Sequence, residues 1–132
     1  MFIGLCATSF ASFVYLICRS SSASCADHET QADFDVESYM GLWYEYSRSD
    51  NVPFEGGSCI TAQYTLDSKR KVGVTNSQYL PDSDNIDSSD GKAYCSKLQP
   101  GQCGVKFNAF QPMGRYHVVS TDYTTYSIVY SC

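Results

Sequence analysis

The chain has 132 residues and a formal net charge of -5, with 43% hydrophobic and 17% charged residues. This length predicts one domain, and the apolar fraction excludes an intrinsically disordered chain. The acidic balance excludes the basic surface that binding to nucleic acid or to anionic lipid requires. Seven cysteines in so short a chain indicate an oxidising compartment.

The first predicted element is a secretory signal peptide. Residues 2–18 form a nearly uncharged apolar run that a serine-rich stretch follows. A signal peptide usually has a Lys or Arg before its apolar run, and none occurs here. An uncleaved membrane anchor is therefore the alternative. The run is nevertheless shorter than the roughly 20 apolar residues of a stable span. We therefore predict a secreted, extracellular product with no stable membrane insertion after cleavage, and the oligomeric state is left open.

From residue 41 on, short runs rich in Tyr, Val, Ile, Thr and Phe alternate with turn residues, a pattern typical of an all-β domain. Short connections favour an antiparallel meander. A helical turn over residues 35–39 is predicted to precede the strands, with Asp35 as its N-cap. The strands are predicted at residues 41–48, 59–67, 70–79, 85–95, 103–110, 115–121 and 126–132.

Alternation within these strands places apolar side chains on one face, which must be closed into a barrel or covered. The connection 49–58 is a candidate lid that carries Phe54 beside two glycines. Inward positions should line a pocket for a small hydrophobic ligand, while core filling is the alternative for the aromatic residues. Together with Phe54, the predicted ligand-binding residues are Tyr64, Val74, Asn76, Gln78, Phe107, Tyr116 and Val118.

Motifs at three places in the chain occur in a fixed order: Gly41-Leu42-Trp43, then residues 57–60, then Thr121-Asp122-Tyr123 with Tyr126 three positions later. This order resembles the lipocalins, and within them the branch of apolipoprotein D and the bacterial lipocalins. The resemblance implies an up-and-down barrel of eight antiparallel strands that holds one small apolar ligand. Fatty acids, sterols, retinoids and pigment-like molecules are the ligand classes to expect.

The motif residues have structural roles in such a barrel. Trp43 would fill the tapered closed end, and Gly41 would let the chain turn into the first strand. Thr121 and Asp122, next to Tyr123, would accept hydrogen bonds from backbone N–H groups of the adjoining turn.

The resemblance also predicts that the chain holds seven of eight barrel strands. The eighth strand and a following helix would lie beyond Cys132, so we expect domain 25–132 to be C-terminally incomplete, as a fragment of a longer protein. The alternative is an open barrel, an interaction module whose edge strand pairs with a partner.

The cysteines of the mature domain allow two bridges. The resemblance implies a Cys25–Cys132 disulfide, which favours a cut that retains Cys25, after Ala23 or Ser24, over cleavage after Ala26. We therefore take residues 1–24 as the signal peptide. Cys95 and Cys103 flank a turn and could bridge that hairpin. A turn centred on Pro100-Gly101 would put residue 106 opposite Cys95, so the bridge requires a bulge or a longer loop.

Cys59 is left over and suggests an alternative function. A member of the lipocalins with a thiol facing the cavity can be an isomerase, as in the lipocalin-type prostaglandin synthase, and the thiolate is the reactive form. No basic residue lies near Cys59 in sequence to lower its pKa, and alternation places it on the outer face with Thr61 and Gln63. A carrier without enzymatic activity is therefore the favoured prediction.

Two further site types are not predicted. Residues 82–90 are acidic, but the calcium-loop pattern fails at Ile86, Asp87 and Ala93, so a solvated turn is expected. His28 and His117 lie far apart in sequence, which leaves little material for a histidine metal site. No metal and no cofactor is predicted.

Overall fold

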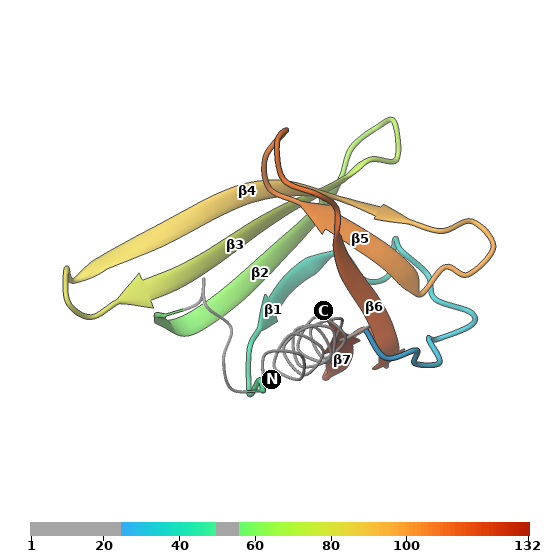
Figure 1. Ribbon diagram of the computed structural model, residues 1–132, viewed down its shortest axis with the longest axis horizontal. Helices are drawn as coiled ribbons and strands as arrows, with labels where there is room; N and C mark the ends of the chain where they lie inside the picture. The colour runs from blue at the N-terminus through green and yellow to red at the C-terminus, as the bar shows by residue number, and fades with distance from the viewer. Residues whose placement is uncertain (1–24, 50–55) are drawn as a thin grey trace, which may run out of the picture.

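The computed structural model describes residues 25–49 and 56–132. Its strands form one antiparallel sheet in which each strand pairs with the next along the chain (Figure 1). The predicted all-β meander is confirmed, while Phe54 and the predicted signal peptide lie outside the described residues. The strands are β1 (Gly41–Tyr44), β2 (Ser58–Leu66), β3 (Val72–Leu80), β4 (Asn85–Cys95), β5 (Gln102–Lys106), β6 (Gly114–Thr121) and β7 (Ser127–Tyr130).

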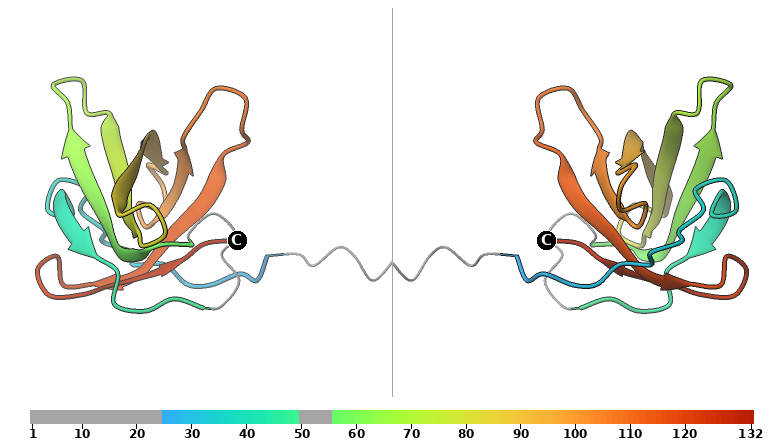
Figure 2. Two further views of the ribbon diagram at one scale, coloured as in Figure 1. Left: turned by 90° about the vertical axis from the view of Figure 1, so that its left-hand side faces the viewer. Right: turned by 90° about the vertical axis from the view of Figure 1, so that its right-hand side faces the viewer.

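The sheet curves into a half-barrel, whose two walls are visible in the side views of Figure 2. The end strands, β1 and β7, each pair with one neighbour and do not contact one another. Within the described ranges, no helix has the length and apolar character needed to cross a membrane.

β1 and β5 end well before their predicted ends at residues 48 and 110, and β7 ends at Tyr130 and not at residue 132. β1 stops at Tyr44, although the N–H of Glu45 still donates to the carbonyl of Ile60 at 2.9 Å. β5 stops at Lys106 because the next residues form a turn, in which the Asn108 side chain accepts hydrogen bonds from the N–H groups of Phe110 and Gln111. Local side-chain bonds of this kind compete with strand pairing.

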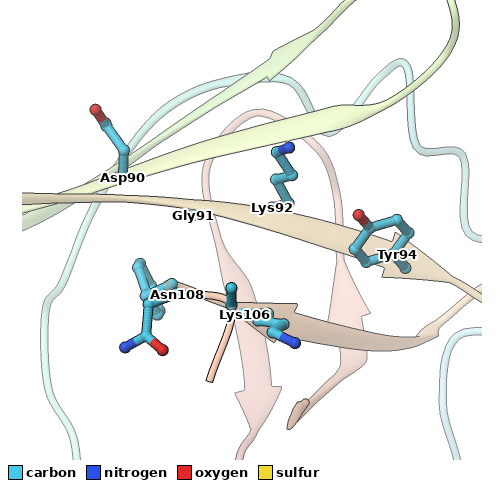
Figure 3. A pocket seen from close by; sticks show the side chains of 8 residues that line it. Asp90, Gly91, Lys92, Tyr94, Lys106 and Asn108 are labelled. Carbon is cyan, nitrogen blue, oxygen red and sulfur yellow. The ribbon is translucent and has the colours of Figure 1, made fainter. Parts of the chain in front are cut away.

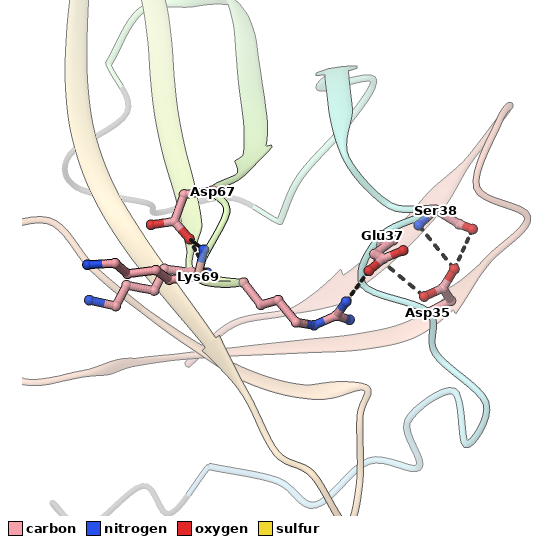
Figure 4. Close-up of polar contacts among 7 residues, drawn as sticks. Asp35, Glu37, Ser38, Asp67 and Lys69 are labelled. Carbon is pink, nitrogen blue, oxygen red and sulfur yellow. Dashed lines mark hydrogen bonds and ion pairs between the residues drawn. The ribbon is translucent and has the colours of Figure 1, made fainter.

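The helical turn before β1 forms as predicted, as a single turn. The N–H groups of Glu37 and Ser38 both donate to the Asp35 carboxylate at 3.2 Å (Figure 4). The N–H of Tyr39 donates to the Asp35 carbonyl. A hydrogen bond from the Ser38 hydroxyl is the main cause that lowers the pKa of Asp35. An ion pair from Arg70 to Glu37 joins this turn to the β2–β3 connection.

Both predicted disulfides are present. Cys25–Cys132 attaches the N-terminal arm to the end of the chain, and Cys95–Cys103 joins β4 to β5. Cys95 and Cys103 are direct partners in the register because the connection is the longer loop, 96–101. The turn at Pro100-Gly101, closed by the Gln102 N–H on the Gln99 carbonyl at 2.8 Å, lies at one end of this loop and not at its centre.

Candidate ligand-binding face

The register of the sheet defines rows of side chains on its concave face. Tyr64, Val74 and Gly91 lie side by side on β2, β3 and β4. The next row toward the β3–β4 hairpin consists of Ala62, Asn76 and Ser89, and Gln78 with Asp87 follows. Since residues i and i+2 of a strand share a face, these rows form one continuous wall.

The deep part of this face is a packed core. Tyr64, Val74 and Val118 are 6%, 3% and 0% exposed, so three of the predicted ligand-binding residues are covered by other side chains. A cavity of about 20 Å³ remains among the core residues, which is room for about one water molecule. The buried core consists of Phe34, Tyr39, Tyr64, Val72, Val74, Ala93, Cys103 and Val118.

A chain of hydroxyl groups crosses this core. The hydroxyl of Tyr64 donates to that of Tyr116 at 2.8 Å, and the hydroxyls of Tyr116 and Tyr39 are 3.0 Å apart. The Tyr39 hydroxyl in turn lies 2.8 Å from the Ser127 Oγ. Burial is the main cause that raises the pKa of Tyr64, of Tyr116 and of Tyr39, so all three phenols stay neutral.

Neither Tyr39 nor Ser127 was among the predicted site residues. Tyr39 comes from the helical turn before β1, and Ser127 begins β7, so no local pattern relates them. Trp43 contacts the same cluster: its ring stacks on Tyr39 at 5.0 Å, and its Nε1 donates to the Tyr39 carbonyl. Gly41, two residues earlier, has φ +126°, a conformation that side-chain-bearing residues rarely adopt.

The motif at residues 121–126 forms the β6–β7 turn. The N–H groups of Thr124, Thr125 and Tyr126 donate to Asp122 Oδ1, and the Thr125 hydroxyl donates to its other oxygen. The Thr125 hydroxyl is the main cause that holds the pKa of Asp122 far below its usual value. The Tyr123 hydroxyl accepts hydrogen bonds from Gln31 and from the Asp35 N–H, so the turn also fixes the N-terminal arm.

Three other predicted ligand-binding residues, Asn76, Gln78 and Phe107, are half-buried. Gln78 accepts a hydrogen bond from the Gly57 N–H at 2.9 Å and donates to Asp87 at 3.3 Å. Asn76 Oδ1 is buried and has no hydrogen-bond partner. Phe107 lies over Gly91, where a Cβ atom would stand 2.8 Å from its ring.

Asp87 was missed by sequence reasoning, which placed no charge on this face. The alternation of side chains along β4 does not show which of its two faces lies on the concave side. The pairing of Asp87 with Gln78 in the register places Asp87 on that side. The exposed carboxylate of Asp87 therefore makes the outer part of the face acidic as well as polar.

A hollow of about 430 Å³ lies between β4 and the chain that leaves β5, and it shares Gly91 and Phe107 with the concave face (Figure 3). It opens where the chain separates from β4 after Lys106, which is directly opposite Lys92 in the register. Sequence reasoning did not predict it because it depends on where β5 ends. Its lining residues are Asp90, Gly91, Lys92, Tyr94, Lys106, Phe107, Asn108 and Ala109.

Cys59 is free and exposed at a bulge of β2, where the register shifts between Ser58 and Thr61. Its φ is +51°, in the left-handed region. The thiol thus lies away from the packed core, and no observation supports the isomerase alternative. In the two described ranges, no group of His, Cys, Asp and Glu side chains could hold a metal ion, and residues 82–90 are exposed.

Comparison with known proteins agrees with this architecture. The family model for the lipocalin-like domain matches residues 34–131. Apolipoprotein D from Cavia porcellus is 38% identical over 109 residues, which cover 82% of this chain and 57% of that protein. The Lazarillo protein from Schistocerca americana is 39% identical over 111 residues, which cover 82% of this chain and 51% of the Lazarillo protein.

Solved structures give the same result. Insecticyanin from the tobacco hornworm Manduca sexta aligns with a TM-score of 0.68 at 25% identity, covering 80% of this chain and 58% of insecticyanin. The chain thus spans little more than half the length of these similar proteins.

Proposed function

The chain belongs to the lipocalin family, and we propose that it is a carrier that binds a small hydrophobic molecule on the concave face of its half-barrel. The observation that carries the proposal is the division of this face into a packed apolar floor and a half-buried wall. A largely apolar surface with a few placed polar groups is the usual composition of a small-molecule site.

The proposed contacts follow from this division. Phe107, Asn76 and Gln78 are half-buried and would touch the ligand. Tyr116, whose hydroxyl is held by Tyr64, lies at the edge of the floor. The floor itself, which includes Tyr64, Val74 and Val118, would support the site from below.

We also propose that the protein is secreted and that residues 1–24 are its signal peptide. The two disulfides support this assignment, because such bonds form and persist in oxidising compartments. N-terminal sequencing of the protein recovered from the medium of expressing cells tests it. A mature N-terminus at Cys25 is expected, and retention of residues 1–24 would contradict the assignment.

Fluorescence titration with retinol, oleic acid and cholesterol tests the carrier function. Trp43 and the buried tyrosines are the reporters, and saturable binding of at least one compound is expected. The variant Phe107→Ala should weaken that binding about tenfold, since an aromatic ring that contacts ligand contributes on the order of 1–2 kcal/mol.

Phe110→Ala is the matched control. Phe110 lies on the same β5–β6 connection but is 99% exposed, so its removal should leave the affinity unchanged. Circular dichroism establishes that both variants are folded. The carrier proposal is abandoned if the folded protein binds none of the three compounds saturably.

A further inference from the structure

We infer that the hollow between β4 and the chain that leaves β5 binds the head group of the ligand, and that this head group is an anion held by Lys92 and Lys106. The inference rests on the proposed carrier function and specifies its ligand as a molecule with an apolar body and one anionic oxygen group, such as a carboxylate or a phosphate. The site lies in the side of the sheet, where the two strands separate.

The lining of the hollow includes side chains from both faces of the sheet. A Cβ atom on Gly91 would stand 3.0 Å from Val74 of the core and 2.8 Å from the ring of Phe107, so Gly91 and Phe107 belong to the concave side. Lys92 follows Gly91 and therefore belongs to the convex side, as does Lys106, its partner in the register. The hollow thus borders the proposed ligand-binding face and the convex surface at once.

Lys92 and Lys106 place two positive charges directly opposite each other, an arrangement that destabilises a strand pair. Among the described residues, no carboxylate forms an ion pair with either ammonium group. The two side chains point apart in Figure 3. Because a lysine side chain is long and flexible, both ammonium groups can turn toward one anion. An anion between them would replace a repulsion with two attractions.

The carboxylates near the hollow favour the same position for an anion. Asp90 lines the hollow, but its Oδ1 accepts a hydrogen bond from the Thr75 hydroxyl at 2.6 Å, and two cations face this one carboxylate. Asp87 lies on the concave side, toward the β3–β4 hairpin. A head group that stayed on the concave face would be repelled by Asp87, whereas in the hollow it is attracted by Lys92 and Lys106.

The rest of the hollow suits an apolar body. Its volume of about 430 Å³ lies within the range of small-molecule sites, roughly 300–1,000 Å³. Phe107 supplies an aromatic ring on the concave side, and Ala109 adds a small apolar side chain. A ligand whose body contacts Phe107 and whose head lies between the lysines would therefore reach through the side of the sheet.

Compounds that share one tail and differ in the head group test the inference. Oleic acid and oleyl phosphate are titrated at neutral pH beside oleyl alcohol, with the intrinsic fluorescence of the full-length protein as the signal. We expect at least one of the two anions to bind about tenfold more tightly than the alcohol, since hydrogen bonds from ammonium groups to an anion are strong. The anion with the larger preference identifies the head group. Added salt should reduce the preference, because Lys92 is exposed.

Variants of the two lysines locate the site. Lys92→Gln and Lys106→Gln should each reduce the ratio of anion affinity to alcohol affinity, and the double variant should bring this ratio close to one. Lys92→Arg keeps the charge and should retain the preference. Lys69→Gln, which removes an exposed lysine of the β2–β3 connection, is the control and should also retain it. Circular dichroism establishes that each variant is folded.

The outcomes separate the two proposals. Saturable binding with equal affinity for the alcohol and both anions would overturn the assignment of the hollow and leave the carrier function standing. A preference that the folded double variant retains would do the same, because the anion would then bind elsewhere. Failure of every compound to bind would overturn the carrier function itself, and the assignment of the hollow with it.

Discussion

Single side chains stabilise this protein through two hydrogen-bonded groups that differ in their exposure. The hydroxyls of Tyr64, Tyr116 and Tyr39 are bonded in series inside the core. Asp122, in contrast, is exposed and collects the N–H groups of its own turn. Removal of a hydroxyl should therefore reduce the stability that the first group provides, and a fall in pH should reduce the stability that the second group provides.

Removal of the central hydroxyl should cost more than removal of the terminal one. Tyr116→Phe breaks two hydrogen bonds and leaves Tyr64 without a partner, while Tyr39 keeps Ser127, so the free energy of unfolding should fall by roughly 1–3 kcal/mol. Tyr64→Phe breaks one bond and leaves Tyr116 bonded to Tyr39, so a loss of about 1 kcal/mol is expected. Urea titration measures both values, and equal losses would contradict a chain in series.

Asp122 should make stability depend on acid. The pKa of Asp122 is lower in the folded protein than in the unfolded chain, where a value near 3.9 applies. Its contribution is therefore complete above that unfolded value and is lost as the pH falls toward the folded pKa. The urea midpoint should decline below about pH 5.

The variant Asp122→Asn should reduce this decline. Asp35, whose pKa is also lowered, acts in the same direction, so part of the pH dependence should remain. Asp82→Asn, in the exposed β3–β4 turn, is the control and should keep the full decline. An acid profile that Asp122→Asn leaves unaltered would show that the turn carboxylate does not stabilise the fold.

At the scale of elements, strands and disulfides depend on one another. The longer loop after β4 puts Cys95 opposite Cys103, so that bridge fixes a pairing the strands already make. The Cys25–Cys132 bridge instead joins an arm without strand structure to the far end of the chain. The two bridges should therefore contribute unequally.

Their loop lengths predict the difference. The bridged cysteines are separated by 107 residues in Cys25–Cys132 and by 8 in Cys95–Cys103. Closing the longer loop removes more entropy from the unfolded chain, so replacing Cys25 and Cys132 by Ala should cost roughly 4–5 kcal/mol, against roughly 2–3 kcal/mol for the other pair. Thermal unfolding of the two double variants compares them, and a larger loss for the short bridge would refute the entropic argument.

At the scale of the whole molecule, the half-barrel has two strands with one free edge each. Apolar side chains are exposed on both: Leu42 and Tyr44 on β1 are 49% and 75% exposed, and Ile128 on β7 is 55% exposed. Unpaired edges that carry exposed apolar side chains favour pairing between chains.

The 132-residue chain should therefore associate as its concentration rises. Sedimentation velocity over a range of concentrations measures this, and Leu42→Lys should shift the distribution toward monomer because a charge on an edge strand opposes pairing. Lys97→Arg, in the exposed β4–β5 loop, is the control. A monomer at every concentration would count against the interaction-module alternative.

The sequence by itself determined the strands, the turn capped by Asp35 and the apolar face, because these follow from local patterns of residue type. The resemblance of the sequence motifs to those of the lipocalins predicted the family and the Cys25–Cys132 bridge. Only the tertiary structure decided which inward residues are floor and which are wall: Val118 is fully buried, while Asn76 is half-buried and unpartnered. The two-residue period of a strand shows which side chains share a face. How deeply each of these side chains is buried, where β5 ends and on which face Asp87 lies depend on the register and curvature of the sheet. Register and curvature arise from pairing between segments that are distant in the sequence.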